Sequence, residues 1–229
     1  MKAAVITPYH GESSAVLQRC HKSVLDQTVD VRHIMVSDGM ANAEIDAWNV
    51  DHHLLPCAHD DAGATPRAMA ALSAFSQGYE VVFFLDADNW YEPQHVQIMI
   101  DVLKESGADA AIGTRTIRSR DGTLMYVDTI ESNGENMIDT NTWALTARSL
   151  PYLHTWIVPP AQRLWSDRSF DHAMRNSGLT IARCHVPTVA YVTRWAWHYQ
   201  HAGLQIPDDA VWIDQSADGT LIHRRHDGK

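Results

Sequence analysis

Two aspartates directly follow a five-residue apolar segment, a length that no apolar run of the chain exceeds. Residues Val81 to Leu85 form an uninterrupted apolar run, and Asp86 and Asp88 come straight after it. Two carboxylates at this spacing can both reach one ion as the strand turns, because hard cations such as Mg²⁺ and Mn²⁺ take oxygen ligands and share them with substrate phosphates. We therefore expect Asp86 and Asp88 to hold Mn²⁺ or Mg²⁺ against a diphosphate. The alternative is a solvated turn in which the aspartates only cap the backbone.

Two further side chains could contact a nucleotide. Asp38 ends an apolar run over residues 31–36, and a carboxylate there can accept a hydrogen bond from a nucleobase N–H or a ribose hydroxyl. Arg67 lies on the first turn of a predicted helix, where its guanidinium and the helix N-terminus both favour a phosphate. An ordinary Asp-Gly turn and a surface arginine are the alternatives for these two positions.

The segments that carry these residues alternate between two periodicities. Strands are predicted over residues 3–7, 31–36, 53–57, 80–85 and 108–113, and helices over 16–25, 65–75 and 93–106. This alternation predicts an α/β fold with a mostly parallel sheet and helices on both faces. Ligands of such sheets bind beyond the carboxyl ends of the strands, which is where Tyr9, Asp38 and the acidic pair fall.

The second half of the chain is less regular. The pattern predicts a helix over residues 141–150, another over 169–177, and one or two strands over 180–192. Six of the eight tryptophans fall in this half, and aromatic rings commonly line sugar-binding pockets. We expect a single domain over residues 1–229, with a nucleotide-binding half (1–114) and an elaborated acceptor-binding half (115–229).

Composition excludes several classes of protein. The net charge of −10 argues against a nucleic-acid partner. The longest apolar run has five residues, far short of the roughly 20 that a transmembrane helix needs. The N-terminus lacks a secretory pattern, and the three cysteines are isolated. We therefore expect a cytoplasmic protein without a transmembrane segment.

Several of these segments together resemble a family 2 glycosyltransferase, an inverting family with the GT-A fold. The resemblance covers about residues 3–114, with several motifs in the family's order. The matching segments are residues 5–9 (VITPY), 20–28 (CHKSVLDQT), 34–39 (IMVSDG), 63–69 (GATPRAM) and 83–89 (FFLDADN). The sequence departs from the usual pattern at Ser37, where the family has an aspartate, and at Pro66-Arg67-Ala68.

The resemblance implies transfer of a sugar from a nucleoside diphosphate donor, UDP-linked, to the hydroxyl of a carbohydrate or other acceptor. It implies that Pro8 and Tyr9 line the base pocket and that Asp38 contacts the base. Arg67 would approach the ribose or diphosphate. Asp88 would be the firmer metal ligand, whereas Asp86 would bind through water or contact the donor.

An inverting transferase also needs a general base for the acceptor hydroxyl. By the same resemblance this base is Asp167, with Asp171 as the fallback; the alternative is that Asp167 caps the following helix. His198 follows an Arg-Trp-Ala-Trp segment that in related transferases lies near the diphosphate. It is a candidate third metal ligand or phosphate contact.

Two other functions remain open. A nucleotidyltransferase uses a similar sheet with acidic metal ligands, but it usually carries a Gly-rich basic loop after the first strand, and residues 8–12 (PYHGE) are neither. A catalytically silent nucleotide- or carbohydrate-binding module on the same fold is the second alternative. Metal-dependent hydrolysis of a UDP-sugar separates both from a transferase.

Overall fold

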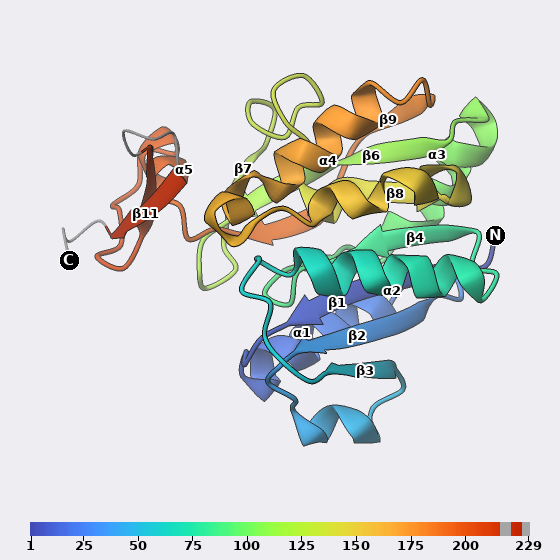
Figure 1. Ribbon diagram of the computed structural model, residues 1–229. Coiled ribbons are helices and arrows are strands. Elements are labelled where there is room, and N and C mark those ends of the chain that lie inside the picture. The colour runs from blue at the N-terminus through green and yellow to red at the C-terminus, as the bar shows by residue number, and fades with distance from the viewer. Residues whose placement is uncertain (216–220, 226–229) are drawn as a thin grey trace.

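A nine-stranded sheet forms the centre of the molecule (Figure 1). The computed structural model describes residues 1–215 and 221–225. The strand order is β3-β2-β1-β4-β8-β6-β9-β5, and β7 pairs with the outer end of β6. The strands span β1 (Ala3–Tyr9), β2 (Arg32–Asp38), β3 (Asp51–Leu55), β4 (Val81–Phe84), β5 (Trp90–Tyr91), β6 (Ala110–Arg118), β7 (Leu124–Val127), β8 (Trp143–Thr146) and β9 (Ile181–Val192).

The N-terminal half of the sheet is parallel, as the alternating pattern predicts. β3, β2, β1 and β4 run in the same direction, and Ile6 at the centre of β1 pairs with Ile34 and Phe84. β8 enters antiparallel between β4 and β6, whereas β9 runs parallel to β6. The carboxyl ends of β1, β2 and β4 therefore meet at one end of the sheet.

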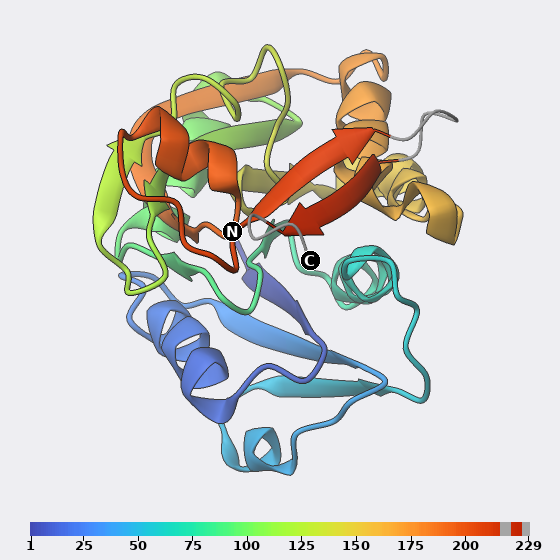
Figure 2. The same ribbon diagram turned by 90° about the vertical axis from the view of Figure 1, so that its left-hand side faces the viewer.

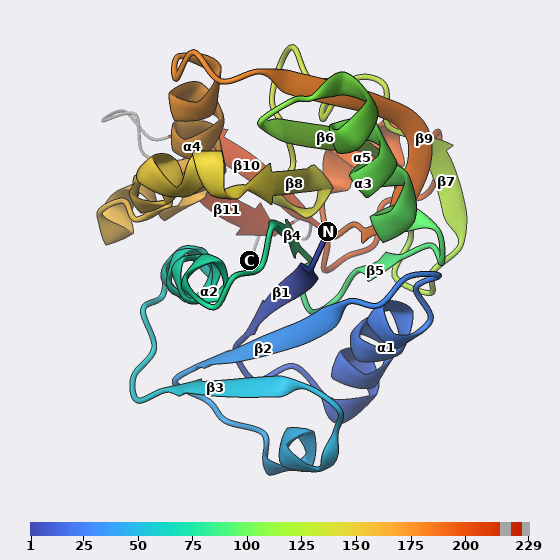
Figure 3. The same cartoon turned by 90° about the vertical axis from the view of Figure 1, so that its right-hand side faces the viewer.

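Helices cover both faces of the sheet (Figure 3). One face carries α2 (Ala64–Ser76), the 3₁₀ segment η3 (Ala147–Trp156) and α4 (Ser166–Arg175), and the other carries α1 (Ser14–Leu25) and α3 (His95–Ser106). Strand residues alternate between the two cores, because successive side chains on a strand point to opposite faces. Phe84, for example, packs edge-on against Trp156, which in turn stacks on Phe170.

The structure differs from the predicted elements in the second half. Residues 141–150 are not a helix: a short 3₁₀ turn η2 (Thr140–Thr142) is followed by β8 and then by η3. Trp143 and Leu145 are buried, and pairing of β8 between β4 and β6 overrides the local helical pattern. Residues 181–192 form one strand, because Pro187 lies where the register with β6 shifts and a missing N–H is tolerated.

The last described part of the chain lies across the carboxyl end of the sheet (Figure 2). It comprises α5 (Ala196–His201) and a hairpin of β10 (Val211–Gln215) and β11 (Leu221–Arg225). The remaining 3₁₀ segments are η1 (Ala43–Ala47) and η4 (Pro160–Trp165). Among residues 1–215 and 221–225, no helix has both the length and the apolar character needed to cross a membrane.

Candidate active site

A cleft of about 470 Å³ opens at the carboxyl ends of β1, β2 and β4. Both halves of the chain line it. The lining comes from the turn after β4, the start of α2 and the start of α4, among other segments. Seven of the predicted site residues line this one cleft: Pro8, Tyr9, Asp38, Arg67, Asp86, Asp88 and Asp167. The topology therefore brings together side chains that are up to 159 positions apart in the sequence.

Tyr9 is held in place by a chain of hydrogen bonds behind its ring. Its hydroxyl accepts a bond from the backbone N–H of Asn42 and lies 2.7 Å from His52 Nε2. His52 Nδ1 in turn lies 2.6 Å from an Asp46 carboxylate oxygen. The tyrosine ring is 2% exposed. This arrangement fixes the ring at one wall of the cleft, and its partners His52 and Asp46 were not predicted.

Asp38 is oriented by the loop that follows β3. Its carboxylate accepts hydrogen bonds from the backbone N–H and the Nδ1 of His59, the latter at 2.6 Å. The neighbouring Gly39 has φ +80, and a Cβ there would lie 2.3 Å from the Ala58 backbone nitrogen. The Asp-Gly pair is thus required by a close approach of two loops, and it presents a carboxylate at the edge of the cleft.

Arg67 and Asp86 form an ion pair across the cleft floor. Gly63 (φ +79) lets the chain turn into α2 beside Pro8, which places Arg67 on the first turn of the helix. The Arg67 guanidinium is 3% exposed, and its Nη2 donates to Asp86 Oδ1 at 2.7 Å. Its Nε has no hydrogen-bond partner among the described residues. Arg67 lines the cleft, so its positive charge lies next to any anionic ligand bound there.

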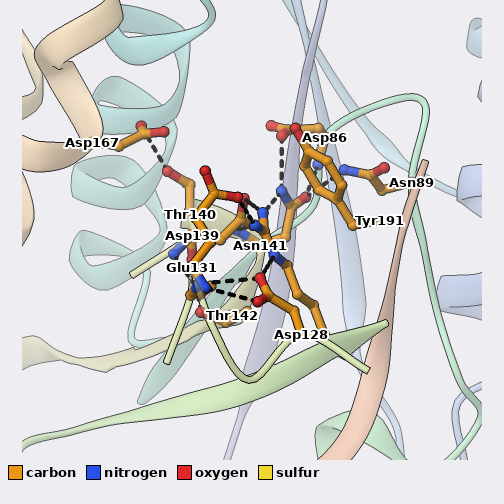
Figure 4. Close-up of polar contacts among 12 residues, drawn as sticks. Asp86, Asn89, Asp128, Glu131, Asp139, Thr140, Asn141, Thr142, Asp167 and Tyr191 are labelled. Atoms are coloured by element: carbon orange, nitrogen blue, oxygen red, sulfur yellow. Dashed lines mark hydrogen bonds and ion pairs between the residues drawn. The ribbon is translucent and has the colours of Figure 1, made fainter. Parts of the chain in front are cut away.

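Asn141 clamps the other side of Asp86 (Figure 4). Its Oδ1 accepts the Asp86 backbone N–H at 2.6 Å, and its Nδ2 donates to Asp86 Oδ2 at 2.8 Å. The same Nδ2 donates to Asp139 Oδ1. Because both carboxylate oxygens of Asp86 are already occupied by protein donors, Asp86 is fixed within the cleft floor. Asn141, expected at the start of a helix, was not among the predicted site residues.

Asp88 is the freer carboxylate of the pair. Its side chain is exposed in the cleft, and within the described part of the chain no other residue donates a hydrogen bond to it. Loss of hydration in the cleft and the nearby Asp86 charge raise the pKa of Asp88 to about 7. A divalent cation would relieve this repulsion.

No group of three or more His, Cys, Asp or Glu residues in the described chain is arranged to bind a metal ion. The residues thus fit an ion that takes most of its ligands from a bound diphosphate and water.

Asp167 faces the same cleft from the opposite wall. It lies within the first turn of α4 instead of preceding the helix. The Thr140 hydroxyl donates to Asp167 Oδ1 at 2.8 Å, which leaves Oδ2 for another donor (Figure 4). Burial raises the pKa of Asp167, against the opposing effect of the Arg67 charge. The fallback residue Asp171 instead pairs with Arg175 at 2.6 Å and does not line the cleft.

A buried arginine beneath the cleft was not predicted. Arg115 is 1% exposed and forms ion pairs with Asp128, Glu131 and Asp139. Burial, opposed by the Arg115 charge, raises the pKa of Asp139 to about 6. Asp139 also accepts from Asn141, so the Arg115 cluster braces the Asp86 turn. Its acids come from an irregular stretch, and no local sequence pattern indicates that they meet.

His198 lies within this cluster and not beside the acidic pair. Its ring is fully buried, with Nδ1 bonded to the Thr193 hydroxyl and Nε2 3.1 Å from a Glu131 carboxylate oxygen. Both ring nitrogens are therefore occupied, and His198 does not line the cleft. The structure does not bring it together with Asp86 and Asp88 as a third metal ligand. His198 instead contacts Glu131, one of the carboxylates that pair with Arg115.

The sequence profile of glycosyl transferase family 2 matches residues 4–157. This match spans most of the central sheet together with the Asp38, Arg67 and Asp86–Asp88 turns. The chain belongs to glycosyl transferase family 2.

One relative agrees with this assignment. The glycosyltransferase GlyA of Streptococcus pneumoniae serotype 4 is 28% identical over an alignment of 117 residues, which covers 49% of this chain and 16% of GlyA. The chain therefore matches only a small part of that protein.

Solved structures confirm the predicted fold class. A crystal structure of S. aureus TarS residues 1–349 with UDP superposes with a TM-score of 0.63 at 14% identity, covering 88% of this chain and 63% of TarS 1–349. The corresponding TarS complex with UDP-GlcNAc also gives a TM-score of 0.63 at 14% identity, covering 87% of this chain and 61% of that one. The chain thus spans less than two thirds of these structures, and the shared GT-A fold is what the likeness shows.

Proposed function

We propose that this chain is an inverting, metal-assisted glycosyltransferase that moves a sugar from a UDP-linked donor to an acceptor hydroxyl. The observation that carries this proposal is the position of Asp88 and Asp167 on opposite walls of one cleft. A metal-binding carboxylate on the donor side and a base on the acceptor side are the two groups that direct displacement at an anomeric carbon requires.

The donor half of the cleft suits a nucleoside diphosphate. Tyr9 and Asp38 line the part of the cleft that we assign to the base, and the carboxylate of Asp38 can accept a hydrogen bond from it. Arg67 lies beneath the expected diphosphate. Mn²⁺ or Mg²⁺ held by Asp88 would neutralise charge on the departing UDP. Complexes of the fold relative TarS with UDP and UDP-GlcNAc support this choice of donor.

Asp167 acts as the general base. The Thr140 bond orients its carboxylate, and its raised pKa brings it closer to the operating pH, where a base is most effective. The acceptor O–H proton passes to Asp167 while the acceptor oxygen bonds to the anomeric carbon. The bond from that carbon to the diphosphate oxygen breaks with its electron pair on UDP, so the configuration inverts.

A thermal-shift panel tests the proposal. Wild-type protein is scanned with UDP, GDP, ADP, UDP-sugars and UTP, each with and without Mn²⁺. We expect UDP and a UDP-sugar to raise the Tm, more with Mn²⁺ than without, and we expect Mn²⁺-dependent UDP release from that UDP-sugar. A silent binding module would show the shift without UDP release, and a nucleotidyltransferase would prefer UTP. If no nucleoside diphosphate binds with metal, the proposal fails.

A further inference from the structure

Charge is divided unevenly between the two walls of the cleft. The wall built from the first half of the chain carries six carboxylates and one arginine, Arg67, which is already paired with Asp86. The wall built from the second half carries three carboxylates and four arginines, namely Arg115, Arg163, Arg168 and Arg194. In a chain with a net charge of −10, positive charge is thus concentrated on the side that carries the proposed base.

Arg163 and Arg168 differ from most other arginines of the molecule. Eight described arginines form ion pairs with Asp or Glu, and Arg115 alone is held by three carboxylates. Arg163 and Arg168 are exposed at the cleft, and within the described residues no carboxylate pairs with either of them. Their guanidinium groups are therefore available to an anion from outside the chain.

The position of both arginines is tied to Asp167. Arg168 directly follows Asp167 in the first turn of α4, and Arg163 lies in η4, four positions before Asp167. The Arg168 guanidinium carbon lies 4.8 Å from the centre of the Trp165 ring. Stacking of this kind restricts the side chain and leaves the N–H edge of the guanidinium for an oxyanion. Both arginines line the same cleft as Asp167, so an acceptor that reaches Asp167 comes near them.

We propose that Arg163 and Arg168 form a subsite for an anionic group of the acceptor, a phosphate or a carboxylate next to the hydroxyl that Asp167 deprotonates. This inference rests on the proposed function of the cleft. A guanidinium group binds either oxyanion through paired N–H bonds. The donor diphosphate is the competing occupant, but Asp88 and Arg67 on the opposite wall already provide for it. The acceptor is therefore a hydroxyl compound that carries an anionic group.

Calorimetric titration of the UDP-loaded protein tests the subsite. The donor site is first saturated with UDP and Mn²⁺. Glucose, glucose 6-phosphate and glucuronate are then titrated as probes, together with glycerol and glycerol 3-phosphate. We expect each anionic probe to bind at least about tenfold more tightly than its neutral counterpart, because charge-assisted bonds add to the contacts of the sugar or polyol. Comparing glucose 6-phosphate with glucuronate distinguishes a phosphate group from a carboxylate.

Variants assign the effect to these residues. Arg163→Gln and Arg168→Gln should each weaken binding of the preferred anionic probe about tenfold, and 0.5 M NaCl should weaken it in the wild type. Arg148→Gln is the matched control, because Arg148 is an exposed arginine that pairs with Asp109 and does not line the cleft. It should bind the probe like the wild type.

Three outcomes overturn the subsite. Equal binding of neutral and anionic probes shows that the cleft does not select charge, and the absence of binding by any anionic probe at millimolar concentration shows the same. A tenfold loss of UDP affinity in the glutamine variants assigns the arginines to the donor diphosphate. Failure of the proposed function has a different signature, since the wild type would then not bind UDP with Mn²⁺. The probe titrations of the unloaded protein still measure charge selection in that case.

Discussion

Replacing Asn141 with alanine should strongly destabilise the protein, because the hydrogen bonds of this side chain connect the two halves of the site. Asn141 is 1% exposed and bonds to the Asp86 backbone N–H, to the Asp86 carboxylate and to the Asp139 carboxylate. Alanine leaves the Asp86 backbone N–H and the Asn89 Nδ2 without this acceptor and removes one donor from each carboxylate. A lost partner costs about 1–3 kcal/mol per buried group. Because these four groups belong to one network, we expect about 3–5 kcal/mol in total, less than their sum.

Urea unfolding followed by circular dichroism measures this loss. Asn49→Ala is the matched control, because Asn49 is exposed and makes one hydrogen bond with Arg32; it should change the free energy of unfolding by less than about 1 kcal/mol. The slope of the transition should stay the same in both variants. A loss below about 1 kcal/mol for Asn141→Ala would refute the reasoning that Asn141 satisfies buried groups of the Asp86 turn.

Three further predictions concern the same network and the base wall. Arg115→Met should lower the free energy of unfolding by about 3–5 kcal/mol in urea, because three carboxylates lose their shared cation; a loss below 1 kcal/mol would contradict this. Asp139 has a folded pKa of about 6 against an ordinary 3.8, so its contribution to stability is fully present below pH 3.8 and is lost as the pH rises through 6. The stability of Asp139→Asn relative to wild type should therefore rise by about 2.5 kcal/mol between pH 4 and pH 8, and a flat difference would contradict the raised pKa. Tyr9→Phe should cost about 1–2 kcal/mol of stability through its lost bonds to Asn42 and His52, while calorimetry should show UDP affinity within about threefold; a larger loss would mean that the hydroxyl itself binds the nucleotide.

The first half of the fold could be predicted from sequence because its signals are local. Val81–Leu85 is apolar throughout because β4 is buried on both faces, and the parallel order then carries Tyr9, Asp38 and Asp88 to one edge. The second half could not be predicted in the same way. β8 is made of residues whose pattern suits a helix, and only its two neighbouring strands decide its state.

The residues of the candidate site differ in the same way in how well the sequence predicts them. Residues that end strands or begin helices, such as Asp86 and Arg67, are visible in the sequence because their place in the fold is fixed by periodicity. Asn141 and Arg115 are not, because each gains its role from partners that meet only after β6 and β8 pair. His198 shows the opposite error. Its neighbours in the sequence suggested a metal ligand, but in the fold its two ring nitrogens contact Thr193 and Glu131.

The central claim is that Asp88 and Asp167 have separate tasks, one in holding the metal-bound donor and the other in removing the acceptor proton. The most direct measurement compares Asp167→Asn with wild type in two assays on one preparation: calorimetric UDP binding with Mn²⁺, and UDP release from the UDP-sugar that binds best. We predict UDP affinity within about twofold of wild type and a rate of UDP release lower by at least about 10²-fold, the contribution typical of a general base. Turnover of Asp167→Asn within tenfold of the wild-type rate would contradict the account.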